Sequence, residues 1–240
     1  MLIWNSFKIN LHCYLHAVHL LIFDILIFAF CSPYTSDSER IADVTTFMMA
    51  GHDTTAYQLS WIIIELSRNP KVVEKLRIEL DAIFPSRDTA VIFTPQHLSQ
   101  LSYLNLIIKE GMRLWPVTAV GTSRIAAANI PYGNKVIPKG SIVGIGFFAM
   151  FRSGISKPDE FIPERWYDTD VDATKLKEMC VPFSSGKRQC VGQNLALLEL
   201  KLVLSTLFYS YDFELTSDIT EMYYITLKPQ NANFKISRRI

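Results

Sequence analysis

The sequence has few cysteines and almost no net charge. Four cysteines in 240 residues are far fewer than small disulfide-stabilised proteins contain, so we expect no disulfide framework. The 24 basic and 23 acidic residues nearly cancel, and no helix-turn-helix signature, zinc-finger spacing or basic arm compensates. Nucleic acid is therefore not an expected partner.

Internal repeats and low-complexity stretches are also lacking. Hydrophobic residues make up 49% and aromatic residues 12% of the chain, which is enough to form a sizeable core. The composition indicates a globular protein of one large domain or two.

The first 35 residues differ from the rest and form a separate segment, residues 1–35. The apolar run over residues 11–31 is long enough to span a bilayer and ends before Pro33, which stops a helix. As a membrane helix it is impure, because Asp24 and three histidines would lie at hydrocarbon depth. The segment is either a membrane span or a wrongly assigned start in an incomplete gene model. Its polar residues favour the second origin over a genuine short product.

The three histidines of this segment have helical spacing. His12, His16 and His19 fall on one face of a helix, from which they could ligate a metal. A polar stripe is the favoured interpretation, because no carboxylate or cysteine completes such a site.

Residues 36–240 predict a mainly α domain with small antiparallel β elements. Ser36 followed by acidic residues is typical of a helix start, and Pro70 and Pro116 mark helix boundaries. Helical spacing predicts helices over residues 40–66, 71–83, a short stretch after Thr94, 103–114 and 192–209. Turn signals and β-branched residues predict an antiparallel unit over residues 118–148 and two final strands over residues 211–215 and 233–237. Residues 151–182 are expected to be irregular.

A loop with a cysteine precedes the last of these helices. Residues 182–196 read PFSSGKRQCVGQNLA, which places Cys190 at a helix start, where unpaired backbone N–H groups favour a thiolate. Gly186 and Gly192 allow the backbone to approach a flat ligand, and Arg188 offers a bidentate donor for a carboxylate. A single thiolate with such an arginine fits haem iron and its propionates better than zinc, which requires more protein ligands.

The run Phe183-x-x-Gly186-x-Arg188-x-Cys190-x-Gly192 resembles the haem-binding loop of the cytochrome P-450 superfamily, with every signature position filled. The resemblance implies that Cys190 is the proximal ligand of the haem iron. It also implies that Arg188 binds a propionate and that the Phe183 ring packs beside the thiolate.

A polar insertion, Ala50-Gly51-His52-Asp53-Thr54-Thr55, interrupts the apolar pattern of the long helix. It is similar to the family's oxygen-activation site, which implies that Thr54 orients water, Asp53 feeds protons, and Ala50 and Gly51 lie against the cofactor. The helix is then expected to widen locally, a feature that is often functional. The plain alternative is a Thr54 hydroxyl bonded to the carbonyl of Ala50.

Two distant motifs resemble the family's buried ion-pair network. Glu110 and Arg113 lie three residues apart on one helix, and Arg165 follows in Pro-Glu-Arg-Trp. The resemblance implies that these three residues form a structural network. The stretch over residues 150–158 looks abbreviated, with Phe151 where many relatives carry histidine, so we expect that Arg165 can be displaced.

Arg124, at the start of the predicted β unit, resembles a second propionate ligand. A solvated charge at a strand end is an equal alternative. By the same resemblance, residues 117–121 line the pocket over the haem.

The resemblance covers residues 36–240 and corresponds to the carboxy-terminal half of the family's fold. It implies a haem monooxygenase that inserts one oxygen atom from O2 into a lipophilic substrate at the endoplasmic reticulum membrane. NADPH-cytochrome P-450 reductase or an equivalent donor would supply the electrons, received at a basic surface near Lys187 and Lys201. The alternatives are a non-catalytic fragment that does not bind haem productively, and a haem-thiolate isomerase or dehydratase. The Asp53-Thr54 pair argues against the second of these.

Overall fold

The computed structural model describes residues 36–85, 91–121, 123–167 and 169–239. The apolar run over residues 11–31 and its three histidines lie outside the described residues, as do Cys13 and Cys31. The two remaining cysteines, Cys180 and Cys190, are free thiols.

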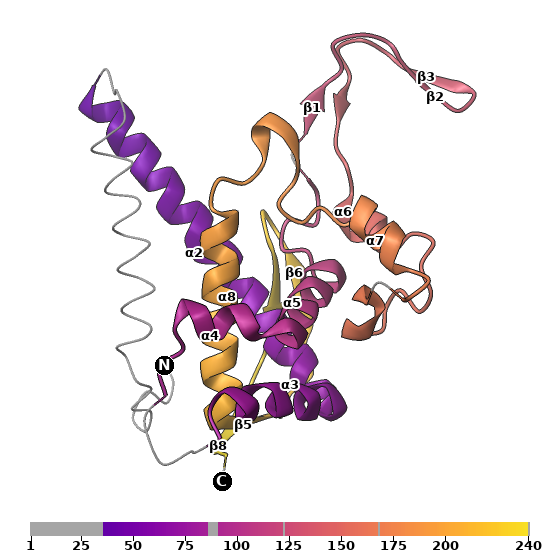
Figure 1. Cartoon of the computed structure of the whole chain (residues 1–240). Coiled ribbons are helices and arrows are strands. Elements are labelled where there is room, and N and C mark those ends of the chain that lie inside the picture. The colour runs from indigo at the N-terminus through magenta and orange to yellow at the C-terminus, as the bar shows by residue number, and fades with distance from the viewer. Residues whose placement is uncertain (1–35, 86–90, 122, 168, 240) are drawn as a thin grey trace.

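Helices form most of the described chain (Figure 1). In chain order they are α2 (Asp37–Arg68), α3 (Pro70–Ile83), α4 (Pro95–Gln100), α5 (Ser102–Leu114), α6 (Phe147–Met150), the 3-10 turn η1 (Pro163–Trp166), α7 (Ala173–Met179), the 3-10 turn η2 (Gly186–Arg188) and α8 (Gln193–Ser210). The strands are β1 (Arg124–Ile125), β2 (Ile130–Tyr132), β3 (Lys135–Ile137), β4 (Ile142–Val143), β5 (Tyr211–Leu215), β6 (Thr220–Tyr223), β7 (Leu227–Gln230) and β8 (Phe234–Arg238).

The helix boundaries follow the capping residues of the sequence. The Ser36 hydroxyl accepts from the Glu39 amide at 3.3 Å and begins α2. Pro70 occupies the first turn of α3, where a proline loses no hydrogen bond. The start of α5 has no cap of its own, and the Glu79 carboxylate of α3 accepts instead from the amides of Tyr103 and Leu104. These contacts fix α3 against α5.

The main core lies where α2, α3, α5 and α8 meet. Its fully buried side chains include Ile62, Leu66, Leu76, Leu80, Leu101, Leu104 and Leu204. A second cluster joins α2 to β7, where the Trp61 indole stacks on Trp115 at 4.0 Å and donates to the carbonyl of Leu227. The first half of α2 extends beyond this core (Figure 1), so its residues up to Asp53 are mostly exposed.

In the described ranges, the strands form four two-stranded antiparallel sheets. The final pair, β5 with β8, joins residues 211–215 to 234–238, which confirms the predicted strands. Within the predicted unit over residues 118–148, β1 pairs with β4 and β2 pairs with β3, and Gly133 and Gly140 adopt the positive φ values that their turns require. The β6–β7 pair was not predicted, because its strands alternate weakly and contain Pro229.

The segment over residues 151–182 is less irregular than the sequence predicts, because it contains η1 and α7. Only Ala173 and Leu176 of α7 are buried, so this seven-residue helix carries too few apolar positions for its period to be recognised.

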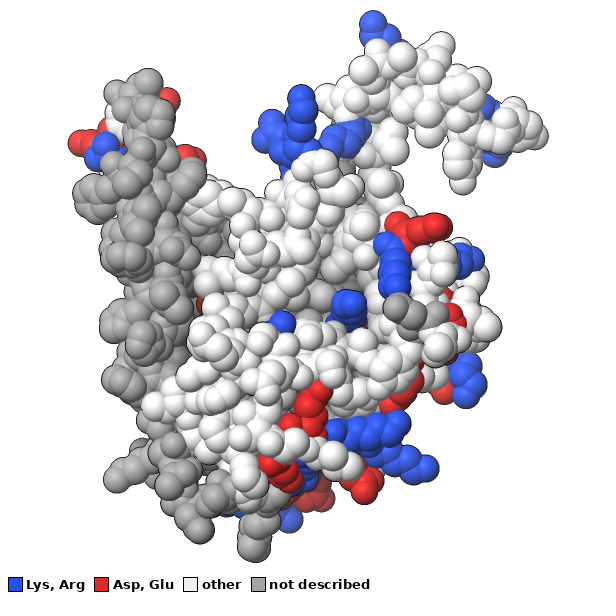
Figure 2. All heavy atoms as spheres, viewed as in Figure 1, with Lys and Arg blue, Asp and Glu red and all other residues white. Residues whose placement is uncertain are grey.

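Charged and uncharged surfaces are separated on the visible face (Figure 2). Acidic and basic side chains alternate along the edge near α3, while the middle of the face is largely uncharged. Over the described ranges, no helix is long and apolar enough to cross a membrane.

Two helical glycines give a matched stability test of this packing. A methyl group at Gly111 of α5 would overlap the Ile62 side chain of α2, whereas one at Gly51 would meet no atom within 4 Å. We expect Gly111→Ala to destabilise the fold by about 1–3 kcal/mol through overpacking. Gly51→Ala should be neutral or stabilising by up to about 1 kcal/mol through helix propensity. Urea unfolding measures both, and equal effects would contradict the packing of α2 on α5.

Candidate functional site

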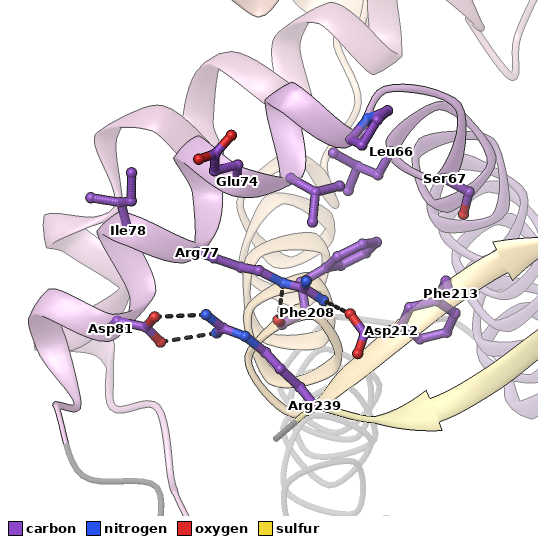
Figure 3. Close-up of a pocket in the computed structure, with 12 residues that line it drawn as sticks. Leu66, Ser67, Glu74, Arg77, Ile78, Asp81, Phe208, Asp212, Phe213 and Arg239 are labelled. Carbon is purple, nitrogen blue, oxygen red and sulfur yellow. Dashed lines mark hydrogen bonds and ion pairs between the residues drawn. The ribbon is translucent and has the colours of Figure 1, made fainter.

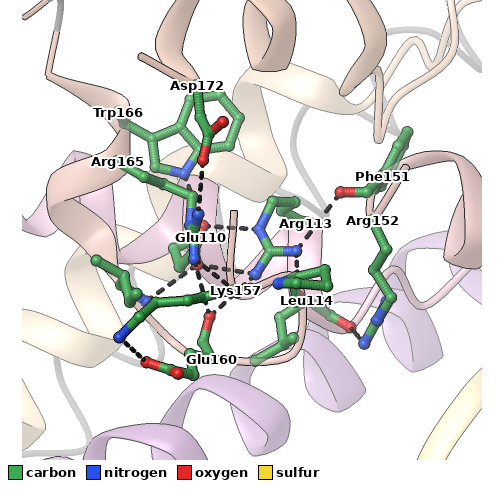
Figure 4. Close-up of polar contacts among 12 residues, drawn as sticks. Glu110, Arg113, Leu114, Phe151, Arg152, Lys157, Glu160, Arg165, Trp166 and Asp172 are labelled. Carbon is green, nitrogen blue, oxygen red and sulfur yellow. Dashed lines mark hydrogen bonds and ion pairs between the residues drawn. The ribbon is translucent and has the colours of Figure 1, made fainter. Parts of the chain in front are cut away.

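The Glu110 carboxylate is fully buried and lies at the centre of an arginine network (Figure 4). Its Oε1 accepts from Arg113 Nη2 and Arg165 Nε, each at 2.9 Å, and from the Ile162 amide at 3.0 Å. Its Oε2 accepts from Arg113 Nε and Trp166 Nε1, each at 2.9 Å. The structure therefore brings the three sequence-predicted residues together, since α5 supplies Glu110 and Arg113 and η1 supplies Arg165.

Both arginines also donate hydrogen bonds to backbone carbonyls. Arg113 donates to Pro158 and Glu160 at 2.7 and 3.1 Å, and Arg165 donates to Ser156 and Lys157 at 2.8 and 2.9 Å. These bonds replace the water that a buried guanidinium loses. They also fix the path of the chain between Ser156 and Glu160.

The expected displacement of Arg165 does not occur. Phe151 is fully buried and stacks on Phe147 with ring centroids 5.1 Å apart, so it fills its position by packing. Its carbonyl faces Arg113 Nη1 at 3.5 Å. The abbreviated stretch therefore still reaches η1 with Arg165 in contact with Glu110.

Two members of the network were missed from the sequence. Trp166 follows Arg165 directly, but its indole donor gives no sequence signal of a distant partner. Asp172 Oδ2 lies 3.2 Å from Arg165 Nη1 and also accepts from the Ser156 amide and hydroxyl. Burial alone would raise the pKa of Asp172, but the Ser156 hydrogen bonds and the Arg165 charge lower it below its usual range. The two arginines are thus balanced by two carboxylates.

The cysteine loop leads from this network to α8. The Cys190 amide donates to the Phe183 carbonyl at 3.0 Å, which closes the loop. Gly186 has a φ of +75°, a conformation that favours glycine. Cys190 is exposed, and α8 begins three residues later after Gly192. Figure 2 shows basic side chains gathered above the core at the place where Figure 1 has this loop.

The other free cysteine, Cys180, differs chemically from Cys190. Burial raises the pKa of the Cys180 thiol to about 12, although the nearby Arg113 charge opposes this. Cys180 is therefore a neutral thiol at physiological pH and a poor metal ligand, because the thiolate is the binding form.

The polar insertion of α2 forms ordinary helix. Thr54 donates to the Ala50 carbonyl at 2.7 Å, as the plain alternative predicted, and α2 is a continuous α-helix from Asp37 to Arg68. The expected local widening is therefore wrong for this structure, since the hydroxyl satisfies that carbonyl without opening the helix. Asp53 is exposed, with one carboxylate oxygen 2.9 Å from His52 Nδ1.

A cavity lies between α2 and the cysteine loop. It measures about 40 Å³, and its lining includes Thr54 of α2, Phe183 of the loop and Ala196 of α8. Val117 and Thr118 also line it, and they belong to residues 117–121, which the resemblance places over the haem. The polar insertion and the cysteine loop thus face the same cavity, although Thr54 and Phe183 are 129 residues apart in the sequence.

The two proposed propionate ligands are both exposed. Arg188 lies in η2 beside Cys190. Arg124 lies on β1, opposite Val143, and donates to the neighbouring Ser123 carbonyl at 3.1 Å. No residue of this pair lines the cavity.

A larger cavity lies elsewhere, between α3, the end of α8 and the β5–β8 pair (Figure 3). It measures about 350 Å³, but none of the sequence-predicted site residues line it. Its two arginines are already paired, Arg77 with Asp212 at 2.6 Å and Arg239 with Asp81 at 2.7 Å. Because both arginines are already paired with carboxylates, they give this cavity little net positive charge with which to bind an anionic ligand.

Comparisons with known proteins point to one family. The family model described as Cytochrome P450 matches residues 29–236. Cytochrome P450 monooxygenase BOT4 of Botryotinia fuckeliana is 36% identical over 76% of this chain, and cytochrome P450 4d8 of Drosophila melanogaster is 35% identical over 75%. The crystal structure of a cytochrome P450, CYP102L1, matches 85% of this chain with a TM-score of 0.74 and 28% identity, and the match covers 47% of that chain.

The fold is that of part of a cytochrome P450, and the cysteine loop precedes its last helix, α8. The chain belongs to the cytochrome P450 family. It spans between 34% and 39% of the length of the curated relatives it matches.

The residues present fit the haem group that this family implies. The Cys190 thiol is exposed, and side chains added at Gly186 or Gly51 would meet no atom within 4 Å. A methyl group at Gly192 would lie 4.0 Å from the Cys190 sulfur, so glycine leaves the sulfur uncovered. An accessible thiol beside open backbone suits a flat macrocycle.

The network predicts a large cost for Glu110→Gln. The change keeps the shape but removes the charge that balances two buried arginines, so we expect a loss of about 3–5 kcal/mol in the free energy of unfolding. Lys235→Ala is the control, because Lys235 and Glu214 form an exposed pair at 3.4 Å. That variant should change stability by less than about 0.5 kcal/mol. A loss of similar size in both variants would contradict the buried network.

The carboxylate of η1, Glu164, predicts acid sensitivity. Glu164 accepts from Lys75 Nζ at 2.6 Å and from the Tyr103 hydroxyl at 2.7 Å. Burial would raise the pKa of Glu164, but these two hydrogen bonds lower it below 4.5. The stability that Glu164 contributes is therefore full above its unfolded pKa and is lost as the pH falls through the lower folded value. Glu164→Gln should reduce stability at neutral pH and lose less of it on acidification, which unfolding curves across the acid range measure; an unchanged acid limb would exclude this role.

Proposed function

We propose that this chain forms the haem-binding part of a haem-thiolate monooxygenase that acts on a lipophilic substrate. The observation that carries the proposal is the shared cavity: Phe183, which accepts from the Cys190 amide, faces the same space as Thr54 of α2. When bound, haem supplies the activation of O2 and the transfer of one oxygen atom.

Each loop residue has a role that follows from its position. The exposed Cys190 would ligate the iron as a thiolate, and Phe183 would pack beside it. Arg188 and Arg124, both exposed, would bind the propionates, because a guanidinium pairs with a carboxylate through two hydrogen bonds. The Glu110 network would fix the chain that precedes this loop.

Two residues of α2 would bind water and transfer protons. The Thr54 hydroxyl donates a hydrogen bond to the Ala50 carbonyl, so its oxygen can still accept a hydrogen bond from a water molecule in the cavity. Asp53 is exposed beside His52, so its carboxylate can take up protons from solvent and release them to nearby water.

The substrate and partners follow from the surroundings of the site. The cavity of about 40 Å³ is too small to hold a substrate, but most other residues lining it are apolar, including Met112, Pro116 and Val117, so the wall that a substrate over the haem would face suits a lipophilic molecule. Lys187 is exposed beside the cysteine loop and Lys201 is half-buried on α8. These charges suit an acidic electron donor such as an NADPH-dependent reductase. An endoplasmic reticulum location is part of the same proposal.

The carbon-monoxide spectrum of the reduced, haem-loaded chain tests the proposal. We expect a thiolate-type Soret band, its loss in Cys190→Ser, and its retention in Cys180→Ser, which makes the same change at a neutral buried thiol. Absence of the band in the unchanged chain would mean a fragment that does not bind haem productively. Turnover of a lipid hydroperoxide without reductant, and none with NADPH and reductase, would favour an isomerase or dehydratase.

A further inference from the structure

An unpaired amide lies in the contact between α2 and α8. Gln58 is 5% exposed, and its Nε2 has no hydrogen-bond partner among the described residues. A buried amide without a partner is costly, so nearly all such groups bond to protein or to ordered water. Gln58 lines the cavity that also contains Thr54 and Phe183.

The cavity is large enough to hold water. Its volume of about 40 Å³ exceeds the roughly 10–15 Å³ that one water molecule needs. A buried water also needs two to four polar partners. Thr54, Thr55 and Gln58, all from α2, supply polar side chains to this space.

Glu199 of α8 adds a carboxyl group that the proposed function does not use. It lies between Ala196 and Leu200, which both line the cavity, and it pairs with the Thr55 hydroxyl. Burial raises the pKa of Glu199, and the Thr55 hydrogen bond only partly opposes this.

No charged side chain lines the cavity in the described part of the chain. The lining side chains come from α2, α5, residues 116–118, the cysteine loop and α8, and every one of them is uncharged. They include Thr54, Thr55, Gln58, Met112, Pro182 and Phe183. Glu199 does not itself line the cavity but reaches it through Thr55, and a half-buried carboxyl group beside such an uncharged lining is more stable when it carries its proton.

We propose that this cavity is a hydrated proton-storage site, in which Glu199 holds the proton while Thr55 and Gln58 bind the water through which it exchanges. Glu199 gives its proton to the Thr55 hydroxyl while that hydroxyl gives its own proton to the cavity water, the water passes a proton toward Thr54, and solvent reprotonates the carboxylate left behind. Delivery toward Thr54 rests on the proposed function, whereas the site itself needs only the chain.

Infrared spectroscopy of the purified chain without haem tests the proton. We expect a C=O stretching band of a protonated carboxyl group at neutral pH, which shifts in D2O and is lost in Glu199→Gln. Glu178→Gln, the same change at an exposed glutamate of α7, should keep the band. Glu199→Asp should keep a shifted band, which guards against misfolding of the glutamine variant. The absence of any such band at neutral pH in the unchanged chain would overturn the proposal.

A Gln58→Leu variant tests the water. If the amide binds water, the variant loses that water, the Glu199 band moves to higher frequency, and the melting temperature does not rise. A raised melting temperature with an unchanged band would show a dry, unpaired amide and overturn the hydrated site.

These results separate the two proposals. The infrared band without a thiolate-type Soret band would contradict the proposed function and leave the proton site in place. The Soret band without the infrared band would contradict the proton site alone.

Discussion

The part of the fold that carries the candidate site depends on the hydrogen bonding of the buried Glu110 carboxylate. This carboxylate accepts five hydrogen bonds from Arg113, Ile162, Arg165 and Trp166. A buried charge is tolerated only when its lone pairs are filled and opposite charge is close. Because the donors come from α5 and from η1, the carboxylate can be satisfied only if these two segments meet in one arrangement. Removal of one partner leaves the others charged in a space that excludes water.

The same constraint extends toward the cysteine loop. Arg165 and Asp172 tie η1 to the start of α7, and the chain passes from α7 through Cys180 to the loop. Phe183 then packs against the main core, and its carbonyl accepts the Cys190 amide. The exposed thiol is thus carried by a loop whose two ends are fixed, one by the ion-pair network and the other by α8. Such pre-organisation is what the proposed role of Cys190 as an iron ligand would require.

The sequence was informative where a residue acts on its own neighbours. Caps such as Ser36 and Thr94 predicted helix starts to within a few residues, and Gly133 and Gly140 predicted the turns of the β unit. Spacing and family resemblance selected Glu110, Arg113 and Arg165 before their contacts were known. The sequence was uninformative where a residue's partner lies far away along the chain. Nothing near Glu79 indicates that it caps α5, and nothing near Asp172 indicates that it pairs with Arg165.

The two corrections, by contrast, concern local contacts that the sequence left open. The polar insertion around Thr54 suggested an opened helix, but the threonine hydroxyl satisfies the Ala50 carbonyl and α2 stays regular. The abbreviated stretch around Phe151 suggested a displaced Arg165, but packing of Phe151 on Phe147 compensates for the change of residue. In both cases a local contact decides the outcome, and residue type alone does not reveal which contact forms.

The central claim is that the Glu110 network positions the cysteine loop. Amide hydrogen exchange, resolved to single residues in the chain and in an Arg165→Lys variant, tests it most directly. If the network fixes the loop, exchange in the variant becomes faster at Ile162, which bonds to Glu110, and also at Cys190, which bonds to Phe183. Faster exchange at Ile162 with unchanged protection at Cys190 would show that the loop is held independently and would contradict the account.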